Sequence, residues 1–140
     1  MAKDTGEIVK ELGMCPDFKT FYDENRSYMV SASLPELLEA KLAEKGLSRA
    51  AVIRAAELSE VYAYQIFSGV RVPKREKLLC LAVAMGLNID EVQTLLKCAG
   101  YPALYVKLPF DSVLLYGICK RMSVVEINGL LYDYGLETLG

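Results

Sequence analysis

The chain has 140 residues, of which 53% are hydrophobic and 24% charged, a composition typical of a globular protein with a real core and not of a disordered one. Its formal net charge of −2 weighs against a strongly basic coat for nucleic acid. It does not exclude DNA binding, because affinity depends on where the basic residues lie. No apolar run approaches the roughly 18 residues that span a bilayer, and residues 1–10 carry charges of both signs, so we expect neither a membrane segment nor a secretory signal.

The chemistry of the side chains argues against an enzyme. The sequence contains no histidine, which removes Ser-His-Asp and Cys-His catalysis and most zinc sites. The cysteines are Cys15, Cys80, Cys98 and Cys119. None belongs to a Cys-x-x-Cys pair, and without an export signal they are typical of reduced, buried thiols. We also find no phosphate-binding glycine loop and no nucleophile elbow, and therefore expect a cytoplasmic protein that is not an enzyme and has no metal or cofactor.

Residues 1–32 predict a small helical arm. Apolar residues recur at helical spacing in two short stretches, the first ending near Gly13 and the second capped by Asp17. These apolar positions are Ile8, Val9 and Leu12, followed by Phe18, Phe21, Tyr22 and Met29. We interpret the arm as packing on the main domain, and the alternative is a dedicated surface for binding a peptide.

Residues 33–101 predict five helices, each delimited by a capping residue or a glycine. The expected helices run from the capping box Ser33–Glu36 to Gly46, from Ser48 through Ala56, from Glu60 to Phe67, from Arg75 to Met85, and from the capping box Asn88–Glu91 to near Gly100. In such a box the first side chain accepts a hydrogen bond from a backbone N–H of the first turn, and the glutamate side chain accepts one from the backbone N–H of the capping residue.

Residues 102–140 predict a further helical hairpin, after a connector that contains Pro102 and Pro109. Its first helix is expected to begin near Asp111, and its second opens with the capping box of Ser123 and Glu126. No stretch alternates between apolar and polar residues with a period of two, so we expect little or no sheet and an all-α fold.

This last hairpin matches the one before it at a fixed offset. Glu126 and Glu91 are 126 − 91 = 35 residues apart. At the same offset Leu114 matches Leu79, Leu130 and Leu131 match Leu95 and Leu96, Ser123 matches Asn88, and Gly135 matches Gly100. One interpretation is a repeated helical hairpin, although two copies are too few for a solenoid. The other is that any two capped helical hairpins look alike.

The stretch from Gly46 to Gly69 carries the main functional signal. It predicts two short helices separated by a tight turn at Glu57-Leu58-Ser59, with Leu58 filling the angle between them. The residues that fall where the helices must touch are Val52, Ala56, Ala63 and Ile66, and the alanines allow a close crossing. This geometry lets the second helix protrude into a major groove, whose width admits one helix.

These residues resemble the XRE, or lambda Cro/C1-like, family of helix-turn-helix domains over roughly Leu34 to Leu96. The landmarks are Gly46-Leu-Ser, the Leu58-Ser59 turn, Ile66, Gly69, Pro73, Lys77 to Leu87, and Asp90-Glu91. The resemblance implies a lambda-repressor-like five-helix bundle at 33–101, between an N-terminal arm at 1–32 and a C-terminal hairpin at 102–140 that packs on it. The patterns Tyr64–Gly69 and Glu126–Leu136 are also similar to a subgroup of such proteins in Gram-positive bacteria.

The resemblance implies a sequence-specific, DNA-binding transcriptional regulator. Family members use the start of their second helix and the exposed face of their third on DNA, and the corresponding residues here are Arg49, Ser59, Glu60, Tyr62, Tyr64 and Gln65. Arg49 can bind phosphate or guanine, and Gln65 can bind adenine. Tyr62 and Tyr64 can contact phosphate or pack on a thymine methyl group.

The loop after this helix adds a basic segment. Arg71, Lys74, Arg75 and Lys77 face only Glu76, a local charge of 4 − 1 = +3. The resemblance implies that Arg71, Lys74 and Arg75 contact the phosphate backbone, and the alternative is an ordinary solvated loop. Residues 31–101 contain nine basic and eight acidic residues, and 9 − 8 = +1 predicts weak non-specific affinity for DNA.

A protein-interaction module on the same scaffold, without DNA binding, is the rival interpretation. Glu60 would face phosphate repulsion, although it can accept a bond from cytosine or simply favour the helix dipole. Ser59 can serve only as a cap, and the tyrosines can form a partner surface. We expect a homodimer, and its seam could include the aromatic segments Tyr101–Phe110 and Tyr132–Gly135, unless these rings complete the core.

Overall fold

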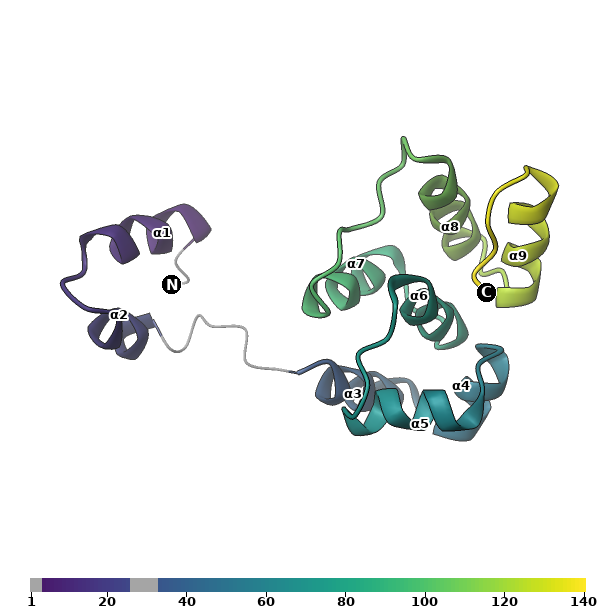
Figure 1. Ribbon diagram of the computed structural model, residues 1–140, viewed down its shortest axis with the longest axis horizontal. Coiled ribbons are helices and arrows are strands. Elements are labelled where there is room, and N and C mark those ends of the chain that lie inside the picture. Colours follow the sequence, from purple (N-terminus) through teal and green to yellow (C-terminus); the bar gives the residue numbers. More distant parts are fainter. Residues whose placement is uncertain (1–3, 26–32) are drawn as a thin grey trace. The chain divides into compact units, whose positions relative to one another are not determined.

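The computed structural model describes residues 4–25 and 33–140 (Figure 1). Within these ranges all the regular elements are helices and none is a strand, which confirms the expected all-α class. The chain divides into two compact units, Met1–Ser31 and Ala32–Gly140. The finer division at residues 101 and 102 stays a prediction. None of the helices in the described ranges is long and apolar enough to span a bilayer.

The N-terminal unit is a hairpin of two short helices, α1 (Thr5–Met14) and α2 (Phe18–Asn25). Asp17 caps α2 as expected, since its carboxylate accepts a hydrogen bond from the Thr20 N–H at 2.7 Å. The amide of Asn25 ties the helices together by donating to the Glu11 carboxylate at 2.9 Å. Met29, which we expected on the second helix, lies outside the described residues. Packing of this arm on the main domain stays a prediction.

Five helices follow at nearly the predicted boundaries. They are α3 (Leu34–Lys45), α4 (Arg49–Ala55), α5 (Glu60–Ser68), α6 (Arg75–Ala84) and α7 (Ile89–Cys98). The boundaries were predictable because local signals set them: Gly46 ends α3 at a φ of 64°, a left-handed conformation that glycine adopts without strain. The Asn88–Glu91 capping box is complete, whereas at Ser33 only one half forms, with the Glu36 N–H donating to the serine hydroxyl at 3.4 Å.

Helix α6 lies at the centre of this unit. Its residues 78–82 are all buried, and it packs against α4, α7 and the C-terminal helix α9 (Val124–Asp133). Helix α3 packs against α5 and α7, while α8 (Pro109–Cys119) packs against α7 and α9. The outer helices therefore bury their apolar sides against one continuous core.

Helix α8 begins at Pro109, two residues earlier than we predicted from Asp111. Proline favours the first helical position because its φ is already helical and it has no N–H to leave unpaired. Asp111 is not the cap: it is buried and pairs with Arg75. At the other end of the hairpin, Leu139 is buried, and its backbone bonds to the side chains of Asn128 and Lys77.

The 35-residue correspondence extends to the backbone of the two hairpins. Helix α9 begins and ends 124 − 89 = 133 − 98 = 35 residues after α7, and its capping box is likewise complete. The tight turns also match, because the Leu87 N–H donates to the Ala82 carbonyl and the Met122 N–H donates to the Gly117 carbonyl. The same turn bond follows α3, so the equal lengths and common offset of α7 and α9 are what favour a repeated hairpin over a similarity of caps alone.

Candidate nucleic-acid interface

The α4–α5 pair is built by two serine caps and a buried contact region. The hydroxyl of Ser48 accepts from the Ala51 N–H at 3.1 Å, and that of Ser59 accepts from the Tyr62 N–H at 3.2 Å. Ser59 therefore acts as a cap, and base contact by its side chain stays a prediction. Ala56 and Ala63 are fully buried, and Leu58 in the turn packs partly buried against the same core.

The outer side of α5 forms a shallow hollow of about 530 Å³. Its lining residues are Arg49, Glu60, Val61, Tyr64, Gln65, Phe67 and Ser68. Four of them were predicted from the sequence, namely Arg49, Glu60, Tyr64 and Gln65. Val61 is 71% exposed and Tyr64 is 45% exposed, so α8 and α9 leave this side of α5 open.

Sequence reasoning missed Val61 and Ser68 on this surface. They extend the face of Tyr64 and Gln65 by one helical turn in each direction, since 61, 64, 65 and 68 follow the spacing of one side of a helix. That spacing could have identified them. Phe67 could not be found in this way, because it is a core residue that only borders the hollow.

Arg49 is held by neighbours on two helices. Its guanidinium pairs with the carboxylate of Glu39 on α3 and lies 5.3 Å from the centre of the Phe67 ring. Both charged side chains of the pair are more than 40% exposed (42% and 44%). An ion pair this exposed contributes only about 0–1 kcal/mol, so a phosphate could compete for the arginine at small cost.

Tyr62, Gln65 and Arg71 form one cluster where α5 meets the next loop. The Arg71 Nε donates to Gln65 Oε1 at 2.8 Å, and its guanidinium lies 5.5 Å from the Tyr62 ring centre. The Tyr62 hydroxyl accepts from the backbone N–H of Lys74 at 3.3 Å. Tyr62 is partly buried and holds the loop, whereas Arg71 and the Lys74 side chain remain exposed.

Arg75 has another role than the phosphate contact we expected. Its guanidinium makes a two-point ion pair with Asp111, with both N–O distances at 3.1 Å, and donates to the carbonyls of Pro102 and Ala103. The Asp111 side chain is 3% exposed. Arg75 thus ties α6 to the start of α8, and we remove it from the candidate interface. Lys77 also turns inward, donating to the Leu139 carbonyl at 3.3 Å.

Glu60 lies exposed in the first turn of α5, at the rim of the hollow. Within the described part of the chain its carboxylate makes no hydrogen bond or ion pair. The helix N-terminus favours a carboxylate there, but the charge also repels phosphate. The hollow is therefore of mixed charge, with a cation at one side and a carboxylate at another.

The cysteines differ from one another more than we expected. Cys80 is buried, and burial raises the pKa of its thiol to about 11, so it stays protonated. Cys15 and Cys98 are partly buried, and Cys119 is exposed, which contradicts the prediction of four buried thiols. In the ranges 4–25 and 33–140, no group of three or more cysteines and carboxylates could hold a metal ion.

The aromatic segments near the C-terminus divide between core and surface. Tyr101 and Phe110 pack partly buried against the core. Tyr132 and Tyr134 are 77% and 67% exposed, so these two rings do not complete the core.

Comparisons of the chain with protein-family models, with curated proteins and with solved structures found no match.

Proposed function

We propose that this chain is a sequence-specific, DNA-binding transcriptional regulator whose α3–α7 helices form a lambda-repressor-like helix-turn-helix domain. In this proposal α5 enters the major groove as the recognition helix. The observation that carries it is the open side of α5, where Arg49, Tyr64 and Gln65 line one hollow beside the exposed Arg71.

The hydrogen bond between Arg71 and Gln65 suits base recognition. It takes one lone pair of Gln65 Oε1 and leaves the second lone pair and the whole amide NH₂ available. A glutamine with both groups free to bond can bind adenine N6 and N7. Arg71, aligned by the Tyr62 ring, and Lys74 would then contact phosphates on the flank of the groove.

The charge of the unit predicts that binding depends on specific contacts more than on bulk attraction. Residues 1–31 hold four of the 16 basic and six of the 18 acidic residues, so residues 32–140 hold 16 − 4 = 12 and 18 − 6 = 12. A unit of zero net charge gains little from counterion release outside the few cations at its interface. We therefore expect weak binding to random DNA.

A protein-interaction module is the second candidate, and the exposed apolar residues of the same region favour it. Val61, Val70 and Val72 are 71%, 77% and 72% exposed, and Tyr64 lies among the residues of the hollow. Exposed apolar residues close to a tyrosine are typical of the centre of a protein–protein interface. The carboxylate of Glu60 would also be better tolerated by a protein than by a phosphate backbone.

The two candidates can be separated by selecting sequences from a random DNA library and titrating the enriched sequence across a salt series. For a regulator we expect Gln65→Ala to weaken binding to the selected sequence by about 1–3 kcal/mol and to leave binding to random DNA unchanged. Arg71→Ala and Lys74→Ala should each lower the salt slope by about one, since each removes one phosphate contact.

Lys120→Ala is the matched control, because it removes an exposed cation at the end of α8. Its salt slope should equal that of the wild type. No enrichment and a flat salt response would overturn the regulator proposal. Sedimentation of the DNA-bound protein tests the proposed homodimer, whose half-sites should lie roughly 34 Å apart on the DNA.

A further inference from the structure

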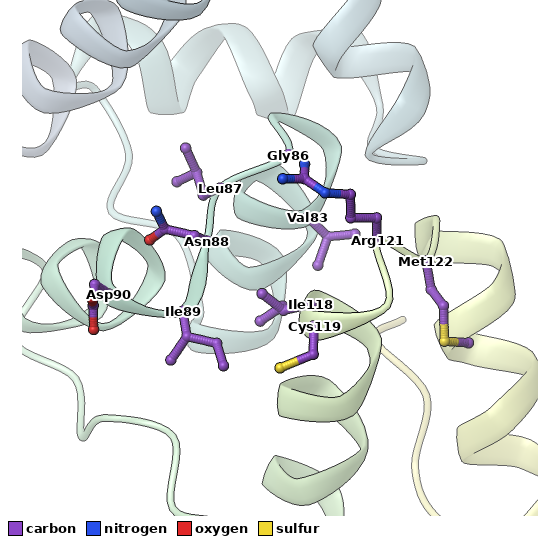
Figure 2. Close-up of a pocket in the computed structure, with 10 residues that line it drawn as sticks. All are labelled: Val83, Gly86, Leu87, Asn88, Ile89, Asp90, Ile118, Cys119, Arg121 and Met122. Carbon is purple, nitrogen blue, oxygen red and sulfur yellow. The ribbon is translucent and has the colours of Figure 1, made fainter.

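A cavity of about 580 Å³ opens between the α6–α7 turn and the α8–α9 turn (Figure 2). Much of its apolar lining comes in equivalent pairs from the two hairpins, since 118 − 83 = 122 − 87 = 35 relates Ile118 to Val83 and Met122 to Leu87. Small-molecule sites are typically concave, about 300–1,000 Å³ in volume, and apolar with a few polar groups. This cavity has the size of such a site, and its lining combines apolar side chains with the polar ones of Asn88, Asp90 and Arg121.

One pair of equivalent positions in the lining differs in kind. Gly86 in the first turn has a φ of 67°, and its equivalent in the second turn is Arg121 with a φ of 55°. The left-handed conformation costs a residue with a Cβ roughly 1–2 kcal/mol, a cost that glycine avoids. The helix ends at Gly100 and Gly135 also use glycine for this conformation. The arginine therefore occupies a position where the backbone alone would favour glycine.

The Arg121 side chain is available to a ligand. It is exposed, and it makes no hydrogen bond or ion pair with the parts of the chain that the structure describes. Figure 2 shows its guanidinium lying over the side of the cavity formed by Gly86 and Val83. The carboxylate of Asp90 lies at the far end of the lining from Arg121 in the same view. Anionic charge is thus favoured at one end and disfavoured at the other.

We propose that this cavity binds a small amphipathic molecule that carries a single carboxylate. The apolar body would lie between Val83, Ile89 and Ile118, and the carboxylate would pair with the Arg121 guanidinium. A guanidinium binds a carboxylate through two parallel hydrogen bonds, which orients the ligand as well as attracting it. Asp90 disfavours ligands with a second anionic group. The proposal does not depend on whether the chain binds DNA.

Decanoate is a suitable probe, with decanol as its uncharged counterpart. We expect decanoate, below its micellar concentration, to raise the melting temperature and to shift the NMR signals of the Ile89 and Ile118 methyl groups. Decanol should bind about five- to tenfold more weakly than decanoate, because an exposed charge-assisted pair contributes about that factor. Arg121→Gly should lower the affinity for decanoate to that for decanol. Arg121→Gly removes the cation while placing glycine at a position that suits it, so the variant should fold.

Cys119 offers a second readout at the site itself, because its thiol is exposed and lines the cavity. The rate of Cys119 alkylation can be measured by mass spectrometry of the peptide that contains it. Decanoate should slow this alkylation in the wild type and in Lys120→Ala. It should slow it less in Arg121→Gly. Two results would overturn the proposal: unchanged alkylation and unchanged methyl signals with decanoate, or binding of decanoate that Arg121→Gly leaves intact.

Discussion

The α6–α7 and α8–α9 hairpins share one backbone register, yet they have different roles in the protein. The first hairpin supplies the centre of the core, since residues 78–82 of α6 are buried without a break. The second covers one side of that core and exposes Tyr116, Val125 and Tyr132, which are 54%, 60% and 77% exposed. Capping residues and glycines therefore determine the course of the backbone, while the remaining positions determine what each hairpin contacts.

Equivalent glutamates show the same division. Glu91 and Glu126 each complete a capping box, and hydrogen bonds lower the pKa of both carboxyl groups. Among the described residues, only Glu91 of the two is also tied to another helix, through Lys41 at 2.8 Å and Lys45 at 3.2 Å on α3. At the same position of the two hairpins, Glu126 therefore has a local capping role, whereas Glu91 also connects its hairpin to α3.

The largest effect is expected at the link between the hairpins, where Arg75 of α6 holds Asp111 of α8. Arg75→Ala should lower the free energy of unfolding by about 3–5 kcal/mol, because it removes the charged partner of the buried Asp111 carboxylate, which keeps only its hydrogen bond from the Tyr105 N–H among the described residues. Urea denaturation at pH 7 measures this loss. The adjacent Lys74→Ala, which removes an exposed cation, should change the free energy by less than about 0.5 kcal/mol.

Replacing both partners of this ion pair provides the stricter test. Arg75→Met combined with Asp111→Leu should recover part of the loss, because it removes the unpaired buried charge but takes away the side-chain partners of the Tyr105 N–H and of the Pro102 and Ala103 carbonyls. If Arg75→Ala unfolds no more easily than Lys74→Ala, the link does not hold α8 in place. Arg75 would then return to the list of candidate phosphate contacts.

A smaller effect is expected where the two hairpins close around their own turns. At the 35-residue offset, Gly117 and Ile127 of the second hairpin correspond to Ala82 and Val92 of the first. A Cβ on Gly117 would lie 2.6 Å from the Ile127 Cδ1. Gly117→Ala should therefore lower the free energy of unfolding by up to about 2 kcal/mol, because overpacking costs about 1–3 kcal/mol and the gain in helix propensity is about 1 kcal/mol.

Ile127→Val in the Gly117→Ala background rebuilds the residue pair of the first hairpin. We expect a favourable coupling of at least about 1 kcal/mol between the two changes, measured as a double-mutant cycle. Gly129→Ala is the control, since a Cβ there meets nothing within 4 Å, and it should gain stability. Additive effects of the two substitutions would show that the hairpins are not equivalent at this position.

The helix boundaries could be predicted from the sequence because their signals are local. The caps at Ser48, Ser59 and Asn88 each bond to a backbone N–H three residues away, so no distant residue is needed to identify them. The left-handed glycines end their helices in the same local way. On α5, the resemblance predicted Glu60, Tyr64 and Gln65, and helical spacing could have added Val61 and Ser68.

The role of Arg75 could not be predicted, because it depends on Asp111, which is 111 − 75 = 36 residues away, and on the burial of both. The charge of the loop indicated a phosphate contact, but charge does not reveal which cation has an internal partner. The exposure of Cys119 is non-local as well, since it follows from which side of α8 packs against α7 and α9. Local signals predicted elements, and long-range packing decided the function of individual side chains.

The difference between Glu91 and Glu126 predicts a difference in pH dependence. The bonds from Lys41, from the Asn88 N–H and from Lys45 lower the pKa of Glu91 from 4.5 to about 2. Because the folded pKa lies below the unfolded one, its contribution is complete above about pH 4.5 and is lost as the pH falls towards 2. Glu91→Gln should thus lose about 1 kcal/mol at pH 7 and almost nothing near pH 2.

Glutamine keeps the acceptor that the capping box requires, so this substitution tests the charge of Glu91 and not the cap. Urea denaturation of the wild type and the variant at several pH values measures the difference between their free energies of unfolding, which should become smaller as the pH falls. Glu126→Gln should lower the free energy of unfolding at pH 7 by less than Glu91→Gln does, since no lysine pairs with Glu126 in the described part of the chain. Equal pH profiles for the two variants would contradict a role for the lysines of α3.

The smallest effect concerns the one turn position where the hairpins differ in backbone strain. Arg121→Gly should raise the free energy of unfolding by about 0.5 kcal/mol, because relief of the left-handed conformation, roughly 1–2 kcal/mol, exceeds the added entropy of glycine in the unfolded chain. Lys120→Gly at the neighbouring position is the matched control. The φ of Lys120 is −91° and carries no such strain, so glycine should lower the free energy of unfolding there by about 0.5–1 kcal/mol. Opposite signs at these adjacent positions would show that the second turn bears a strain that Gly86 spares the first. Equal losses would mean that Arg121 is held without strain, and its place at the cavity would then need no ligand to explain it.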